Sequence, residues 1–386
     1  MWFHHCNDPA CCPGAPARDG AVKRKGDRLT IDVHCHVLIP EVEQLVGGLP
    51  RKQGEIQELM ASMGEASVAH NNATMLPIAG PRLTNVEQRL ADMDAMGVDV
   101  QLLSPSPTQY YYWADESLAR RIARLQNDAI AGLCRSHPHR FAGLGTVALQ
   151  HPALAVEQLR HAMTALGLKG VQISTSVEGL ELDAPALHSF WAEAAALGAV
   201  VFIHPFGTTL GPRTATHYLV NTIGQPLETT IALSRLIFGG VLDACPGLRI
   251  IAAHGGGYLP TCISRSNHAH AVRPEAARQA RQQPGAYLQS IWFDTLVYEP
   301  LALRHLIDRV GASQVLVGTD YPFDMGHFDP HALVDATPGL SDEQRRAVLG
   351  GNAARLLGWP GGAQGRGISS CASQIQVAVP HPDRMS

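Results

Sequence analysis

Residues 29–36 have the sequence Leu-Thr-Ile-Asp-Val-His-Cys-His, in which a short apolar run leads into two histidines. The apolar run predicts a buried strand, which His34 and His36 follow directly. Residues i and i+2 of an extended chain point to the same side, so both imidazoles can face one point at the strand's carboxyl end. Imidazole is a common zinc ligand, so the pair suggests chelation, although a chain with 19 histidines could also contain it by chance.

Three further segments repeat the pattern of a short apolar strand followed by a polar side chain suited to a metal site. They are VVFIHP at 200–205, IIAAHGGG at 250–257 and VLVGTDYP at 315–322. Functional groups at the carboxyl ends of parallel strands are typical of a (β/α)8 barrel, so we expect an α/β protein of this type. The expected metal site consists of His34, His36, His204 and Asp320, with His254 beside it.

Length and composition agree with one large domain. The chain has 386 residues, of which 45% are hydrophobic, whereas such a barrel needs about 250 residues before insertions. The net charge of −4 and the scattered basic residues provide no face for nucleic acid. The longest apolar run, at 194–203, is too short for a membrane span, and the first residues lack a secretory signal. We expect a cytoplasmic protein, with no membrane partner, whose eight cysteines are free thiols.

Eight strands alternate with helices in the predicted organisation. We expect the strands at residues 29–33, 98–103, 140–147, 169–173, 199–203, 249–253, 290–294 and 314–319. We expect the helices at residues 83–96, 115–136, 152–166, 184–197, 226–239, after the glycine turn at 255–257, at 300–310 and at 342–358. A long insertion at 38–82 follows the first strand and covers the active-site face. The barrel domain spans 28–359, between an N-terminal arm at 1–27 and a C-terminal tail at 360–386.

Six motifs of the chain occur together in an order and spacing that point to one family. They are IDVHCH at 31–36, RLADMDAMGVDVQ at 89–101, FIHPFG at 202–207, AAHGGGYLP at 252–260, WFDT at 292–295 and GTDYPFDMG at 318–326. Over residues 29–358 the chain resembles the amidohydrolase superfamily, in the branch of 2-amino-3-carboxymuconate 6-semialdehyde decarboxylase and γ-resorcylate-type decarboxylases. The spacing favours the first of these.

The resemblance implies a metal centre and its catalytic groups. One divalent metal ion, usually zinc, with manganese as the alternative, would be bound by His34, His36, His204 and Asp320. His254 and Asp320 would be catalytic, with His254 as the acid/base group near a metal-bound water, whose pKa such an ion lowers from about 15.7 towards 7. The ordinary alternatives are a packing histidine for His254 and a helix N-cap for Asp320.

The fourth strand favours one metal ion over two. Hydrolytic relatives often hold two ions bridged by a carboxylated lysine at the end of this strand. Here the nearest lysine, Lys169, is expected at the start of the strand, away from the site. A single-metal centre follows, which favours decarboxylation. Asp294, which ends the expected strand at 290–294, is expected to support the site and not to bind the metal.

A carboxylate substrate needs cationic anchors, which guanidinium groups provide. Arg89 and Arg265 match positions that contact the substrate carboxylate in the resembled decarboxylases, Arg265 from the neighbouring subunit of a homodimer. Phe206 and Phe323 are candidates for aromatic walls. The alternatives are surface or capping arginines and core aromatic rings.

These features together predict a metal-dependent, non-oxidative decarboxylase of an unsaturated or aromatic carboxylic acid. Aminocarboxymuconate semialdehyde is one candidate substrate among ring-cleavage products and hydroxybenzoates. Residues 38–82 and 104–113 match the family pattern poorly, and these loops shape the pocket. A single-metal hydrolase or hydratase of a lactone or unsaturated acid therefore remains the alternative. A barrel protein that binds a small molecule without turnover is disfavoured, because the four candidate metal ligands and His254 are all present.

Overall fold

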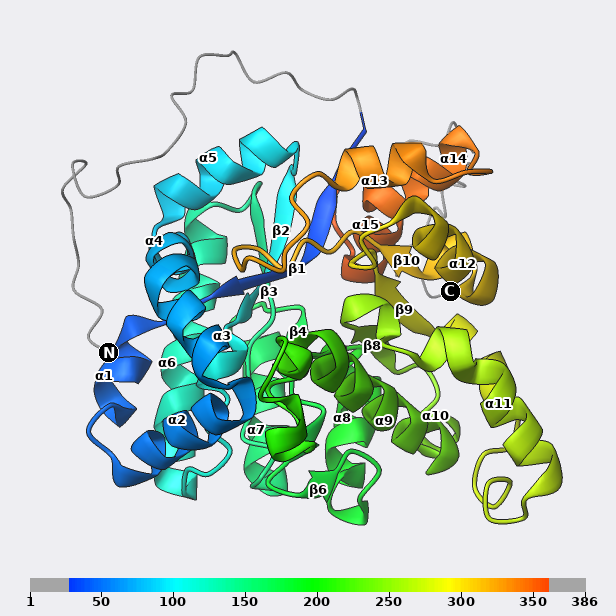
Figure 1. Cartoon of the computed structure of the whole chain (residues 1–386), viewed down its shortest axis with the longest axis horizontal. Coiled ribbons are helices and arrows are strands. Elements are labelled where there is room, and N and C mark those ends of the chain that lie inside the picture. The colour runs from blue at the N-terminus through cyan, green and yellow to red at the C-terminus, as the bar shows by residue number, and fades with distance from the viewer. Residues whose placement is uncertain (1–27, 361–386) are drawn as a thin grey trace, which may run out of the picture.

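Eight parallel strands form the centre of the computed structural model, which describes residues 28–360 (Figure 1). The predicted arms at 1–27 and 360–386 therefore lie outside the described residues, apart from residue 360. The strands pair in the orders β1-β2-β3 and β10-β9-β8-β7-β4. They are β1 (Ile31–Val37), β2 (Val100–Pro105), β3 (Phe141–Gly143), β4 (Gly170–Ile173), β7 (Val200–Ile203), β8 (Arg249–Ala252), β9 (Ile291–Asp294) and β10 (Val315–Leu316).

The two sheets join at both edges, which closes the barrel. Next to β3 and β4, Gly145 pairs with Val171 in a parallel bridge. On the other side, Cys35 of β1 pairs with Tyr321, which follows β10. The predicted (β/α)8 barrel is therefore confirmed.

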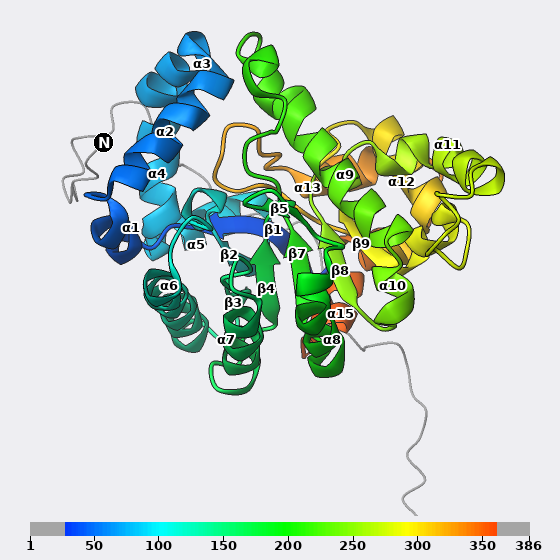
Figure 2. The same ribbon diagram turned by 90° about the horizontal axis from the view of Figure 1, so that it is seen from below.

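Helices surround the barrel in the expected order (Figures 1 and 2). They are α1 (Pro40–Val46), α2 (Pro50–Met63), α3 (Glu65–His70), α4 (Leu76–Thr84), α5 (Val86–Met96), α6 (Glu116–Ser136), α7 (Pro152–Thr164), α8 (His188–Leu197), α9 (Gln225–Phe238), α10 (Val241–Ala244), α11 (Leu259–Val272), α12 (Pro300–Val310), α13 (Pro330–Ala336), α14 (Asp342–Arg346) and α15 (Asn352–Leu357). Helices α1 to α4 make up most of the insertion. In Figure 2 the arrowheads of β4 and β7, which mark the carboxyl ends of these strands, point to the side of the molecule on which α2 and α3 lie. Within residues 28–360, no helix has the length and hydrophobicity that a bilayer span requires.

The apolar core follows the two-residue period of the strands. In β7, Val200 and Phe202 belong to a cluster of residues from strands around the ring, which fills the barrel interior and packs against α15. Val201 and Ile203 point the other way and pack with residues of the outer helices. His204 continues the inward-facing row of Phe202, because it lies two residues further along.

Strand β1 changes phase at a β-bulge. Val33 belongs to the interior cluster, but Cys35 packs with residues of α5 and α6. The pairing with β2 shifts in register between Asp32 and Cys35, which accounts for the change. His34 and His36 consequently face the barrel interior. The expected strand at 29–33 was therefore too short, because both histidines lie within β1 and do not follow it.

Two expected helices also differ in detail, and one hairpin was not expected. The expected helix at 83–96 is divided at Asn85, whose extended backbone separates α4 from α5 and whose side chain caps α5. The expected helix at 342–358 contains a π-helical turn at Ala347–Gly351. A hairpin of β5 (Ser176–Val177) and β6 (Leu180–Glu181) has no counterpart among the expected elements, because strands of two residues show no period.

Candidate metal centre

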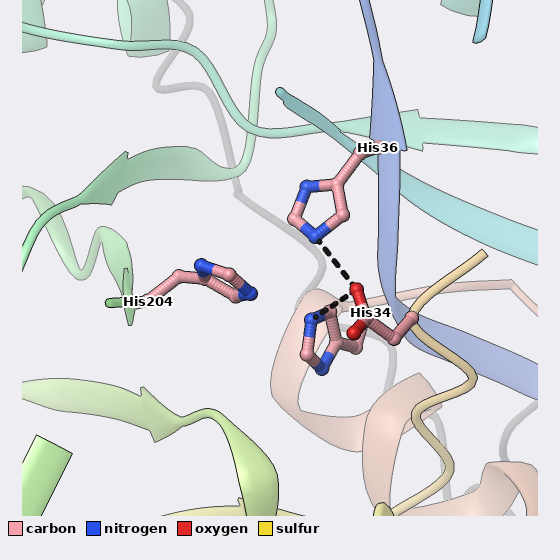
Figure 3. A group of neighbouring side chains, drawn as sticks. His34, His36 and His204 are labelled. Atoms are coloured by element: carbon pink, nitrogen blue, oxygen red, sulfur yellow. Dashed lines mark ion pairs between the residues drawn. The ribbon is translucent and has the colours of Figure 1, made fainter. Parts of the chain in front are cut away.

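Four side chains from three parts of the barrel converge at the carboxyl ends of the strands (Figure 3). His34 and His36 project from β1, His204 directly follows β7, and Asp320 lies after β10. All four residues are buried, and their ligand atoms all lie within 4.8 Å of one another. The structure thus brings the whole predicted ligand set together.

The cluster holds buried polar atoms that have no hydrogen-bond partner. Asp320 Oδ1 lies 3.3 Å from Nε2 of both His34 and His36. Within residues 28–360, these three atoms and both ring nitrogens of His204 make no hydrogen bond. Each unsatisfied buried polar atom costs about 1–3 kcal/mol. A divalent metal ion would satisfy the inward-facing atoms together, so three imidazoles and one carboxylate fit such an ion.

Burial and neighbouring charges prepare these groups for a cation. Burial lowers the pKa of His36, and it lowers the pKa of His204 well below the usual range with help from the surrounding imidazoles. Both rings are therefore neutral and keep a free lone pair. His34 is the exception: burial opposes its charge, but Asp320 and Asp294 outweigh burial and raise the pKa of His34 to about 10, so a metal ion would have to replace a proton on this ring. Although burial opposes its charge, Asp320 has a pKa well below the usual range because of His34 and the other imidazoles, so it stays ionised.

The outer nitrogens of the two β1 imidazoles have protein partners. His34 Nδ1 lies 2.7 Å from Asp294 Oδ2. His36 Nδ1 lies 3.2 Å from both Pro105 O and Ser104 Oγ. These contacts orient the rings so that each Nε2 faces the cluster.

His254 lies beside the cluster, two residues after the end of β8. Its Nε2 is 3.8 Å from Asp320 Oδ2, and its ring centroid is 5.2 Å from that of His34. Its φ of 56° is a left-handed conformation that costs a non-glycine residue about 1–2 kcal/mol. Asp294 stabilises this backbone, because it accepts hydrogen bonds from His254 N–H at 2.9 Å and from Gly255 N–H at 2.8 Å. One carboxylate thus positions a ring of the cluster and the backbone of His254.

A cavity of about 140 Å³ adjoins the cluster, and His204 and Asp320 belong to its lining. Phe206 and Phe323, the predicted aromatic walls, also line it, and the ring centroid of Phe323 lies 5.6 Å from that of His36. The insertion contributes a set of half-buried side chains, here called the insertion wall: Leu59, Met63, Asn71 and Met75.

The two predicted carboxylate anchors lie away from this cavity. Arg89, on α5, is 2% exposed and donates hydrogen bonds to Gln101 Oε1 at 2.9 Å and to the carbonyl oxygen of His36. Arg265, on α11, is exposed to solvent. Neither belongs to the cavity lining formed by the described residues. Their roles in substrate binding stay predictions.

The fourth strand has the predicted arrangement. Lys169 directly precedes β4, at its amino end. Nearer the carboxyl end, Gln172 donates hydrogen bonds at 2.9 Å to Pro105 O and to the hydroxyl of Tyr110. Residues 170–175, which form β4 and directly follow it, contain no lysine.

Some cavity residues have no clear sequence signal. Tyr218 lines the cavity from the segment between β7 and α9, and Gln225 lines it from the first position of α9. The wall residues Leu59 and Met63 are one helical turn apart, a spacing that also suits ordinary packing. Only their place in loops at the carboxyl ends of strands could have indicated them.

Comparisons with known proteins agree with this geometry. The chain matches the Amidohydrolase family over residues 31–359. It is 33% identical over 341 residues to 2-amino-3-carboxymuconate-6-semialdehyde decarboxylase of Dictyostelium discoideum, across 86% of this chain and 92% of the relative. It is 30% identical to gamma-resorcylate decarboxylase of Rhodococcus jostii (strain RHA1), across 63% and 79%. The crystal structure of 5-carboxyvanillate decarboxylase LigW from Sphingomonas paucimobilis superposes with a TM-score of 0.74 and 27% identity, across 85% of this chain and 98% of that one.

Proposed function

This chain belongs to the amidohydrolase family, and we propose that it is a metal-dependent, non-oxidative decarboxylase of an unsaturated or aromatic carboxylic acid. One observation carries the proposal: the buried cluster of three imidazoles and one carboxylate adjoins a cavity with two aromatic walls. Two relatives at 30% identity or more, which this chain covers over most of their length, are decarboxylases of such acids.

The proposed roles follow from the positions of the side chains. His34, His36, His204 and Asp320 would hold the metal ion. When bound, the ion supplies a positive charge that orients the substrate and stabilises negative charge on its conjugated system. Phe206 and Phe323 would flank a flat conjugated substrate in the cavity.

His254 is the proposed proton donor. Its ring lies beside the cluster, and Asp294 holds its backbone in place. His254 delivers a proton to the carbon that bears the carboxylate. The bond between this carbon and the carboxylate then breaks, its electron pair restores the conjugated system, and carbon dioxide leaves. His254 regains a proton from solvent.

Substrate and metal can be named more narrowly within this proposal. Aminocarboxymuconate semialdehyde ranks first among the candidate substrates, because the relative at 33% identity acts on it and aligns over 92% of its own length. Zinc is the proposed metal, since three nitrogen ligands and one oxygen ligand suit it, and manganese is the alternative.

The working form is proposed to be a cytoplasmic homodimer. Arg265 is exposed on its own chain and would anchor a substrate carboxylate in the partner's cavity. The four described cysteines, Cys35, Cys134, Cys245 and Cys262, are free thiols, which supports a reducing compartment.

Carbon dioxide release tests the proposal directly. Metal-replete protein is incubated with a panel of muconate semialdehydes and hydroxybenzoates, beside His254→Ala and the surface variant His161→Ala. We expect release by the wild type and by His161→Ala, and a large loss in His254→Ala. If no panel member releases carbon dioxide while about one metal ion per chain is bound, the decarboxylase proposal is wrong, and lactones and unsaturated acids become the next substrates to test.

A further inference from the structure

We propose that Arg89 is a positioning residue of the metal centre, which acts through the His36 carbonyl and the Tyr321 ring and does not touch the substrate. The inference rests on the ligand set of the proposed function. It replaces the predicted role of Arg89 as a substrate anchor with one that the contacts of its guanidinium group support.

The guanidinium of Arg89 lies between two of the three segments that carry ligands, β1 and the segment after β10. One nitrogen, Nη2, donates to the carbonyl oxygen of His36 in β1 and to Arg82 O at 3.2 Å. The guanidinium carbon lies 4.7 Å from the ring centroid of Tyr321, the residue after Asp320. A cation over an aromatic face is attracted to it, so Arg89 contacts β1 and the Asp320 segment at once.

A buried chain of hydrogen bonds continues from Arg89 to the other ligand of β1. Arg89 Nη1 donates to Gln101 Oε1 at 2.9 Å, and Gln101 Nε2 donates to Asp32 Oδ2 at 3.1 Å. Asp32 accepts hydrogen bonds at 3.1 Å from the backbone N–H groups of His34 and Thr319. The network therefore reaches both His34 and the residue that precedes Asp320.

The Tyr321 side of the network is anchored to the insertion and to α5. The Tyr321 hydroxyl donates to Asp92 Oδ2 at 2.9 Å, and Arg82 Nε donates to the same oxygen at 2.9 Å. Two backbone hydrogen bonds tie the ligand segments to each other, from His36 N–H to Tyr321 O and from Asp320 N–H to His34 O, each 2.8 Å long. Arg89 thus supports the joint at which the barrel closes, namely the pairing of β1 with the segment after β10.

The burial of Arg89 argues against direct contact with substrate. Its exposure is 2%, and its hydrogen bonds engage both terminal nitrogens of the guanidinium group. Substrate would have to displace these partners, whereas a positioning role uses them as they stand. Residues that orient metal ligands in this way typically change metal affinity by 10–100-fold when they are replaced.

Metal binding by the full-length protein provides the test. Co²⁺ and Zn²⁺ are titrated, by competition with a chromophoric chelator, into wild type, Arg89→Met and Gln101→Met, and the visible spectrum of the Co²⁺ form is recorded. Gln158→Met is the matched control, because the buried side chain of Gln158 accepts a hydrogen bond at 2.8 Å from the N–H of Ala148, a residue outside the cluster. Thermal unfolding and steady-state kinetics accompany each variant.

We expect Arg89→Met to weaken metal binding 10–100-fold and to alter the Co²⁺ spectrum, with KM unchanged at saturating metal. Gln158→Met should lower thermal stability alone. Wild-type affinity and spectrum in Arg89→Met, together with a raised KM, would overturn the inference and restore the substrate-anchor role. If Arg89→Met does not fold, the metal affinity, Co²⁺ spectrum and KM of Gln101→Met test the inference by the same criteria. Wild-type protein that binds no metal would instead overturn the proposed function.

Discussion

The candidate metal centre and the insertion wall face the same cavity but are built differently. His34, His36 and Asp320 come from backbone that pairs with neighbouring strands, and their surroundings are joined by buried hydrogen bonds. The wall residues, such as Met63 and Met75, are half-buried side chains on helices and turns of the insertion. We therefore expect replacements in the metal centre to change the chemistry, and replacements in the insertion wall to change substrate binding with little effect on the metal centre.

The largest expected effect is the loss of one ligand. His204→Ala removes one of three nitrogen donors, so we expect metal content to fall well below one ion per chain and carbon dioxide release to become undetectable. Elemental analysis of the purified variant measures the first effect. His161→Ala, on the outer surface of α7, should keep both metal and activity, and a fully metallated, active His204→Ala would exclude the proposed ligand set.

Replacing the proposed proton donor should separate chemistry from metal binding. In His254→Ala we expect kcat to fall by about 10²–10⁴-fold, the usual range for a general acid or base, while metal content stays at the wild-type level. Kinetics on metal-quantified samples make the comparison. A variant that keeps the wild-type kcat would show that another group transfers the proton.

A variant of Asp294 tests whether a residue that contacts a candidate ligand, but does not bind the metal itself, affects metal affinity. Asp294→Asn presents an amide group where His34 Nδ1 and two backbone N–H groups need an acceptor, so we expect metal affinity to fall by about 10–100-fold. Competition with a chelator measures the change. The control is Asp243→Asn on α10, which alters the carboxylate that accepts a hydrogen bond from the Tyr287 hydroxyl. An equal loss of affinity in both variants would mean that the effect is not specific to the cluster.

The smallest expected effect belongs to the insertion wall. Met63→Ala removes an apolar contact worth about 1 kcal/mol, so we expect KM to rise about fivefold with metal affinity unchanged. Met60→Ala lies on the same helix but is 44% exposed and outside the described cavity lining, so it should leave KM unaltered. A change in metal affinity in Met63→Ala would remove the distinction between the two regions.

The sequence predicted the barrel and the convergence of the four candidate ligands, because both leave local patterns. The buried strand Val200–Ile203, for example, lies within the expected strand at 199–203 and is followed directly by His204. The β-bulge in β1 leaves no such pattern, because the shift in register is visible only in the pairing with β2. The contacts of Arg89 could not be predicted either, because the same helical sequence pattern suits an arginine that faces a cavity and one that binds a buried carbonyl group.

The closure of the barrel joins residues from opposite ends of the described chain. Asp32 and Thr319 share a hydrogen bond although they are 287 positions apart. During synthesis His34 and His36 emerge from the ribosome long before Asp320, so a nascent chain holds an incomplete set of donors until nearly the whole barrel has been made. Bringing such distant segments together is a late and slow event in folding. Stable capture of the metal ion would therefore mark molecules that have finished folding, and metal-deficient cells should accumulate chains that are open at this joint.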